Sequence, residues 1–326
     1  MPTDQLIENC GKTDGSELSG TAKLKAMPAS TFAPPSTMPA ADPLAQLLAP
    51  SLATVRPEFS IIICSPPAND ARFSQIEGVY KQALVGEDYE IIRIQDASSM
   101  AEGYARGAAK AAGRILIFSH DDAAPVRPFG SRLRSHLQRV DIVSGAGTDR
   151  LDGPAWFTAG PPHVFGQVLN SVPARLEIKY PDGRTEVREQ HPLLLSIYGV
   201  PSRLVAGIQA FDGFWFACTR GVVEQIPFDP ETCDTFHMYD VDFSYRAYLA
   251  GAKIGVANDL SLMHASVGGY ACPKWKPAAD KWLAKYGAGL RPHHKDRRYT
   301  SAAVSGTSVP EMLAVMDQMV LRAEES

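Results

Sequence analysis

Apolar and polar positions alternate between two kinds of segment up to about residue 150 of the chain. Short continuous apolar runs, rich in β-branched residues, are typical of strands buried on both faces of a parallel sheet. The segments between them have apolar residues at helical spacing, and Ser99 with Glu102 forms a capping box. In chain order, the pattern predicts a strand at 59–64, a helix at 73–85, a strand at 89–94, a helix from Ser99 to Gly113, a strand at 114–119, a helix at 129–140 and a strand at 141–144. This alternation predicts an α/β fold with a doubly wound, mostly parallel sheet flanked by helices.

The second half of the chain has a different pattern. Residues 176–180 and 184–188 alternate around a Pro-Asp-Gly turn, which predicts an inserted β-hairpin that passes over the site. Residues 208–218 form a strongly apolar, aromatic run and predict one strand. The remaining periodic segments predict a helix from Asp240 to Ala250, strands near Ile254 and Leu260, and C-terminal helices at 274–286 and 310–324.

Composition divides the chain into three parts. Residues 1–56 are rich in Ala, Pro, Ser and Thr, and such a segment cannot bury enough apolar surface to offset its ordering entropy. We therefore predict a disordered tail at 1–56, one α/β domain at 57–290 and a C-terminal extension with a helix at 291–326.

Charge and cysteine usage exclude several classes of function. With a net charge of −4 over 326 residues, the chain lacks the excess of positive charge that binding to nucleic acid requires, so nucleic-acid partners are not expected. The five cysteines are scattered and form no C-x-x-C pair, which predicts buried reduced thiols rather than a zinc site or disulfides. No apolar run is long enough for a transmembrane helix, and the N-terminal segment shows no basic region followed by an apolar core. We expect a cytoplasmic protein, with peripheral attachment to a membrane left open.

Polar side chains follow each of the first three predicted strands. In doubly wound sheets ligands bind beyond the carboxyl ends of the strands, so Ser65, Asp96 and residues 120–122 are candidate ligand contacts. If the chain stays extended, His120 and Asp122 project to one side and Asp121 to the other. Carboxylates at such a position can bind Mg²⁺ or Mn²⁺. The alternatives are a solvated acidic turn at residues 121–122 and a helix cap at Asp96.

A second group of polar residues surrounds the helix that begins near Asp240. Asp240 and Asp242 are two positions apart on this helix and cannot face the same point. One carboxylate should therefore face the cleft, and the other should interact with the helix dipole in the first turn. His264, at the end of a predicted strand, is either a hydrogen-bonded core histidine or a metal ligand.

Five short motifs in order resemble the family 2 type of inverting, nucleotide-sugar-dependent glycosyltransferases, which have the glycosyltransferase-A fold. The resemblance covers roughly residues 59–270 and is closest to a bacterial branch with a His-Asp-Asp type of metal motif. The motifs are Phe118-Ser-His-Asp-Asp122, Phe211-Asp-Gly-Phe-Trp215, Phe228-Asp-Pro230, Phe236-His-Met-Tyr-Asp-Val-Asp-Phe243 and His264-Ala-Ser-Val-Gly268. This resemblance implies that residues 57–290 form a catalytic domain.

The resemblance also implies a role for individual residues. Asp240 corresponds to the general base, and Asp122 and His264 correspond to metal ligands for Mn²⁺ or Mg²⁺. The resemblance implies no role in the reaction for Asp242, so its expected role is the interaction with the helix dipole in the first turn of its helix. Contacts to the donor nucleotide are implied for Ser65, Pro66, Asp96, His120 and Asp121, and contacts to acceptor or sugar for Asp212, Trp215, His237 and Tyr239. Two residues depart from the family pattern, because His120 and Tyr239 each stand where an acid is usual.

The implied activity is hexosyl transfer, with inversion, from a nucleotide-diphosphate sugar to a hydroxyl of a saccharide, a lipid-linked acceptor or a protein. The donor is expected to be UDP-linked. Such a reaction needs one base for the acceptor hydroxyl and a cation for the departing diphosphate. The alternatives are a nucleotide-sugar-binding relative without transferase activity and a sugar nucleotidyltransferase. The latter is disfavoured, as is a dinucleotide-binding dehydrogenase, because residues 65–69 contain no Gly-rich loop.

Overall fold

The computed structural model describes residues 56–171, 174–180, 184–190, 192–266, 272–290 and 302–325. The predicted disordered tail, apart from its last residue, lies outside the described residues. So do the segment at 291–301 and the end of the last motif, at 267–268.

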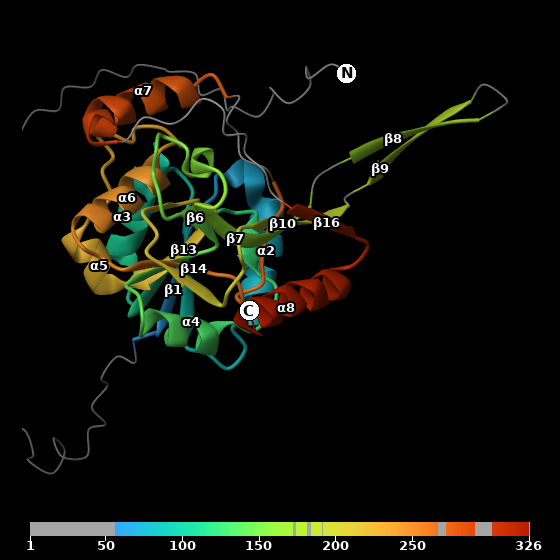
Figure 1. Cartoon of the computed structure of the whole chain (residues 1–326), viewed down its shortest axis with the longest axis horizontal. Helices are drawn as coiled ribbons and strands as arrows, with labels where there is room; N and C mark the ends of the chain where they lie inside the picture. The colour runs from blue at the N-terminus through green and yellow to red at the C-terminus, as the bar shows by residue number, and fades with distance from the viewer. Residues whose placement is uncertain are drawn as a thin grey trace, which may run out of the picture. The chain divides into compact units, whose positions relative to one another are not determined.

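A seven-stranded mixed sheet forms the centre of the fold (Figure 1). Its strands, in spatial order, are β11 (Leu204–Ala206), β14 (Ile254–Ala257), β5 (Ile142–Ser144), β13 (Trp215–Thr219), β3 (Ile115–Ser119), β1 (Phe59–Cys64) and β2 (Tyr89–Ile94). β1 runs parallel to β2 and β3, and β14 runs parallel to β5. β13 is antiparallel to both of its neighbours, and β11 is antiparallel to β14. β1, β2, β3, β5 and β14 therefore all run in one direction, and β11 and β13 run in the other. The predicted mostly parallel sheet is thus present, with two antiparallel strands that the sequence did not indicate.

Helices cover the main sheet and end close to the predicted positions. The described helices are α2 (Asp70–Ala83), α3 (Met100–Lys110), α4 (Gly130–Leu137), α5 (Arg220–Gln225), α6 (Tyr239–Leu249), α7 (Trp275–Tyr286) and α8 (Val309–Glu325), with short 3₁₀ turns η1 (Pro67–Asn69), η2 (Trp156–Ala159) and η3 (Gly287–Gly289). The capping box is confirmed, since the Ser99 hydroxyl accepts a hydrogen bond from the Glu102 N–H. Across the described ranges, no helix combines the length and the apolar character that crossing a bilayer requires.

A second sheet lies beside the first and carries the later part of the chain. Its path is β12 (Ala210–Phe211), β6 (Ala146–Thr148), β7 (Val164–Ser171), β10 (Leu193–Tyr198) and β16 (Ala302–Gly306). β15 (Leu262–His264) joins this sheet by pairing with β7 and with β4 (Ala123–Pro125). α8 packs against β10 and β16 through a small separate core that contains Leu169, Leu195, Ile197, Met312 and Met316.

The single strand predicted at 208–218 is in fact two strands in different sheets. β12 ends at Phe211, and β13 begins at Trp215. At the break, a Cβ on Gly213 would lie 2.6 Å from Cβ of Asp240 and would also collide with the Tyr239 hydroxyl. The chain therefore needs a glycine here, because the start of α6 packs directly against its backbone.

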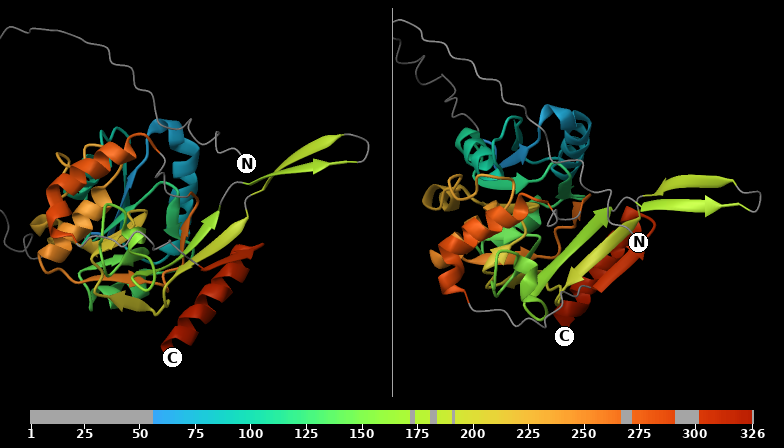
Figure 2. Two further views of the ribbon diagram at one scale, coloured as in Figure 1. Left: turned by 45° about the horizontal axis from the view of Figure 1, so that its top comes forward. Right: turned by 90° about the horizontal axis from the view of Figure 1, so that it is seen from above.

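The predicted hairpin is present as β8 (Ala174–Lys179) and β9 (Thr185–Gln190), which pair antiparallel. Both views in Figure 2 show it extending away from the body of the fold. The expectation that it passes over the site was therefore wrong.

Three of the cysteines behave as predicted. Cys64, Cys218 and Cys233 are buried free thiols, and Cys272 is half-buried. Burial raises the pKa of the Cys64 thiol to about 12, so it stays protonated at neutral pH.

Candidate metal and acid–base site

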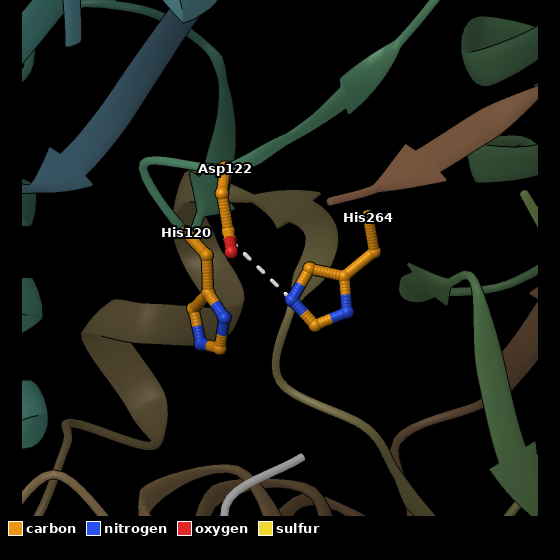
Figure 3. Close-up of side chains that lie close together, drawn as sticks. All are labelled: His120, Asp122 and His264. Carbon is orange, nitrogen blue, oxygen red and sulfur yellow. Dashed lines mark ion pairs between the residues drawn. The ribbon is translucent and has the colours of Figure 1, made fainter. Parts of the chain in front are cut away.

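Three potential metal ligands meet where β3 ends and where β15 pairs with β4. His120 follows β3, Asp122 precedes β4, and His264 closes β15 opposite Ala123. The ligand atoms of the two histidines and the aspartate all lie within 4.8 Å of one another. Nε2 of His264 is 3.4 Å from Oδ1 of Asp122 (Figure 3). The structure thus brings together the predicted pair Asp122 and His264, and it adds His120, which the sequence placed only near the nucleotide.

The protonation states of this cluster suit a cation. Burial raises the pKa of the Asp122 carboxyl, but its hydrogen bond to His264 and the two histidine charges outweigh burial and hold it well below its usual range. Burial and the neighbouring His264 lower the pKa of His120, so its imidazole is neutral at pH 7. Phe214 stacks on the His264 ring, with centroids 5.0 Å apart. A set of two imidazoles and one carboxylate fits Mn²⁺ or another transition ion better than Mg²⁺, which prefers oxygen ligands.

Asp121 faces the opposite way and organises the loop that follows β1. Its carboxylate accepts hydrogen bonds from Oγ of Ser65 at 2.9 Å and from Nδ2 of Asn69 at 2.8 Å. Arg72 lies 3.4 Å from the same carboxylate. On the other side of the loop, Arg93 donates to the carbonyl oxygens of Ser65 and Pro66. The strand alternation predicted this separation of Asp121 from its neighbours.

An open hollow of about 600 Å³ lies between this loop and the metal cluster. Its lining includes Pro66, Asn69, Arg72, Asp121, Asp122 and Phe236. Arg72 supplies positive charge there, and sequence reasoning missed it because a lone arginine in a first helical turn carries no distinguishing pattern. Asp96 does not line this hollow. Its side chain is 78% exposed and pairs with Arg106, so a nucleotide contact by Asp96 stays a prediction.

Asp240 is the second residue of α6 and lies half-buried beside the cluster. Its Oδ2 accepts a hydrogen bond from the Gly213 N–H at 2.9 Å. Burial and the nearby charge of Asp212 raise the pKa of Asp240 to about 7. A carboxyl group that titrates near neutral pH can take up a proton during a reaction and release it afterwards.

A second hollow, of about 530 Å³, opens beside Asp240. Its lining includes His120, Trp156, Asp212, Phe236, His237 and Asp240. Asp212 is held by the Trp156 indole N–H at 3.0 Å and by the Phe214 N–H at 3.2 Å. Phe236, which is 50% exposed, and His120 line both hollows, whereas Asp240 lines only the second. Burial and Lys274 lower the pKa of His237, which is therefore neutral at pH 7.

The structure corrects the predicted environment of two residues, Trp215 and Asp242. Trp215 is fully buried and donates its indole N–H to the Tyr80 hydroxyl, so its side chain cannot contact an acceptor. The indole ring that lines the second hollow belongs to Trp156. Asp242 is also fully buried, and it bonds Arg246, Lys285 and Tyr286. Its charge therefore joins α7 to α6, which is more than the predicted interaction with the helix dipole.

Tyr239 borders the second hollow, but its hydroxyl is already engaged. The side chain is nearly buried, and its hydroxyl oxygen lies 2.6 Å from Nε2 of His120. The preceding residue, Met238, is the N-cap of α6 and has a left-handed backbone with φ of 66°. The sequence contains no signal for this contact, because the two residues are 119 positions apart.

Comparisons with known proteins add little to the site. No family model matches the chain. No curated protein matches it either. Among solved structures, GalNAc-T7 with UDP, GalNAc and Mn²⁺ is similar over 68% of this chain and 45% of its own, at 10% identity and a TM-score of 0.34. A197 from STIV is similar over 65% of this chain and 95% of its own, at 10% identity and a TM-score of 0.31. This chain spans less than half of GalNAc-T7, and similarities of this size do not establish a function.

Proposed function

We propose that this chain is a metal-dependent, inverting glycosyltransferase with a glycosyltransferase-A type of fold. It would transfer a sugar from a nucleotide-diphosphate sugar, UDP-linked, to an acceptor hydroxyl. One observation carries the proposal. A carboxyl group with a pKa of about 7, Asp240, adjoins a cluster of His120, Asp122 and His264 that can hold a divalent cation. The motif resemblance supports the same combination of base and metal site.

On the donor side, His120, Asp122 and His264 would hold the cation, for which Mn²⁺ fits the donor set best. A cation bound there neutralises the charge that develops on the departing diphosphate. Arg72 lines the same hollow and adds a fixed positive charge. The hydrogen bonds of Asp121 hold the loop at Ser65 and Pro66 in place as one wall of the donor hollow.

On the acceptor side, Asp240 would remove the proton of the acceptor hydroxyl. As the O–H bond breaks, the oxygen forms a bond to the anomeric carbon, and the bond from that carbon to the diphosphate breaks. The Gly213 N–H fixes the carboxylate for this step. Phe236, which is 50% exposed, offers aromatic surface to a sugar ring in the second hollow.

The first test is substitution of the proposed base. We expect Asp240→Asn to lower the rate of UDP release from UDP-sugars with Mn²⁺ by about 10²- to 10⁴-fold. Donor binding should persist, because Asp240 lines only the second hollow. The matched control is Asp280→Asn, since Asp280 is 58% exposed on α7 and should leave the rate unchanged.

The same assay separates the proposal from its alternative, a nucleotide-sugar-binding relative without transfer. That alternative is motivated by the unusual His120 at the metal site. Equal, negligible turnover in the unmodified chain and in Asp240→Asn, with a thermal shift by a UDP-sugar retained, would favour the binding relative. The anomeric configuration of the product, determined by NMR, tests the inverting mechanism.

A further inference from the structure

We infer that Tyr239 is a positioning residue that holds the ring of His120 in the orientation needed for metal binding. This inference rests on the proposed metal site. It assigns Tyr239 to the metal side of the site, whereas the sequence had placed it among the acceptor contacts.

The geometry divides the two nitrogens of the His120 ring between two partners. Nε2 lies 2.6 Å from the Tyr239 hydroxyl oxygen. Figure 3 shows the other ring nitrogen, which is therefore Nδ1, turned toward Asp122 and His264. The His120 and His264 rings are 5.5 Å apart and inclined at 61°, so Nδ1 is the nitrogen that can share a cation with His264.

The chemistry of imidazole makes this orientation suitable for metal binding. A neutral imidazole carries one N–H and one lone pair. The Tyr239 hydroxyl can donate or accept, so it holds Nε2 in either tautomer, and a cation on Nδ1 would select the tautomer protonated on Nε2. With the proton on Nε2, His120 donates to the Tyr239 hydroxyl oxygen, and the lone pair of Nδ1 faces the cluster. Residues that fix a ligating histidine in this way strengthen its affinity for metal.

Tyr239 can act in this way because its own ring is held on several sides. The side chain is 5% exposed, and its ring packs edge-on against Tyr104 with centroids 5.5 Å apart. Gly213 leaves room for the Tyr239 hydroxyl, since a Cβ there would collide with it. The hydroxyl is thus presented to His120 at a fixed place, and a phenylalanine would fill the same space without the oxygen.

The experiment measures Mn²⁺ affinity of the full chain by calorimetry or by electron paramagnetic resonance. We expect Tyr239→Phe to weaken Mn²⁺ binding by about 10- to 100-fold. The matched control is Tyr104→Phe, because Tyr104 is a fully buried neighbour whose hydroxyl has no hydrogen-bond partner among the described residues. Tyr104→Phe should bind Mn²⁺ as the unmodified chain does. Melting temperatures without metal report whether either variant is unfolded.

A second readout needs no variant. In ¹⁵N NMR spectra of the unmodified protein loaded with Zn²⁺, which is diamagnetic, His120 should keep its proton on Nε2 and bind the cation through Nδ1. Unchanged Mn²⁺ affinity in Tyr239→Phe, a cation bound through Nε2 of His120, or no Mn²⁺ binding by the unmodified protein would each overturn the inference. Weakened Mn²⁺ binding in Tyr239→Phe supports it even without sugar transfer, and such a lack of transfer counts against the proposed function alone.

Discussion

Asp240 has a raised pKa for two reasons that originate in different parts of the chain. Burial at the start of α6 disfavours its charged form, and Asp212, from the turn between β12 and β13, adds a nearby negative charge. The Gly213 N–H opposes both effects by stabilising the carboxylate. The net result is a group that is partly ionised at neutral pH, whereas an exposed aspartate would be a much weaker base.

This balance predicts the pH dependence of activity. A base must be ionised to act, so kcat/KM should rise as pH increases through about 7 and then level off. Asp212→Asn removes the neighbouring charge and should move the midpoint to lower pH, because the carboxylate of Asp240 is then easier to form. Initial rates at saturating Mn²⁺ between pH 5.5 and 8.5 measure both midpoints. A midpoint that stays in place in Asp212→Asn would show that this neighbour does not tune the group being titrated.

At the scale of elements, Asp242 joins two helices through one buried carboxylate. It is fully buried on α6 and bonds Arg246 of the same helix at 2.7 Å. From α7 it bonds Lys285 at 2.8 Å and the Tyr286 hydroxyl at 2.7 Å. This contact holds α7 against the helix that begins with Tyr239 and Asp240.

We expect Asp242→Asn to lower the free energy of unfolding by about 2 kcal/mol, because Arg246 and Lys285, whose side chains are 22% and 31% exposed, lose the buried carboxylate that they share. Urea denaturation followed by circular dichroism measures the change. Asp280→Asn removes an exposed ion pair with Lys276 on the same helix and should cost less than about 1 kcal/mol. Similar costs for the two variants would mean that Asp242 does not join the helices in solution.

The sequence predicted some elements well because their signals are local. The strand at 59–64 matches β1, which is buried along its whole length and leaves a continuous apolar run. The strand at 89–94 matches β2, a half-buried edge strand that its β-branched residues indicate. The apolar run at 208–218 has the same appearance as that of β1, yet it is broken at Gly213 by the packing of α6. Because tertiary packing causes this break, the pattern of apolar and polar residues along the chain does not reveal it.

The residues of the candidate site also divide into those that a local pattern or a motif predicts and those whose position depends on tertiary contacts. Strand alternation was enough to separate Asp121 from Asp122, and motif resemblance was enough to pair Asp122 with His264. The Tyr239–His120 contact could not be predicted, because nothing near either residue specifies a partner 119 positions away. The role of Trp215 was misassigned for a related reason, since an aromatic residue in a motif looks the same whether it lines a cavity or fills the core.

At the scale of the whole molecule, the site is assembled from distant parts of the chain. His120 and Asp122 come from the first half of the main sheet, whereas Asp240 and His264 come after β13. β13 lies between β3 and β5 and pairs with both. The strand that joins the two halves of the sheet therefore also precedes the segment that supplies the proposed base.

This placement of β13 has a consequence for how the protein is made. Until residues 215–219 leave the ribosome, β3 and β5 each keep an unpaired edge, and the strands β1, β2 and β3 form only part of a sheet. Unpaired edges of apolar strands are sites of aggregation, and pairing over a separation of about 100 residues is slow because the long loop must close first. Synthesis of the chain thus includes a long interval in which the strands of the first half have exposed edges, since β13 and then β14 are made only later.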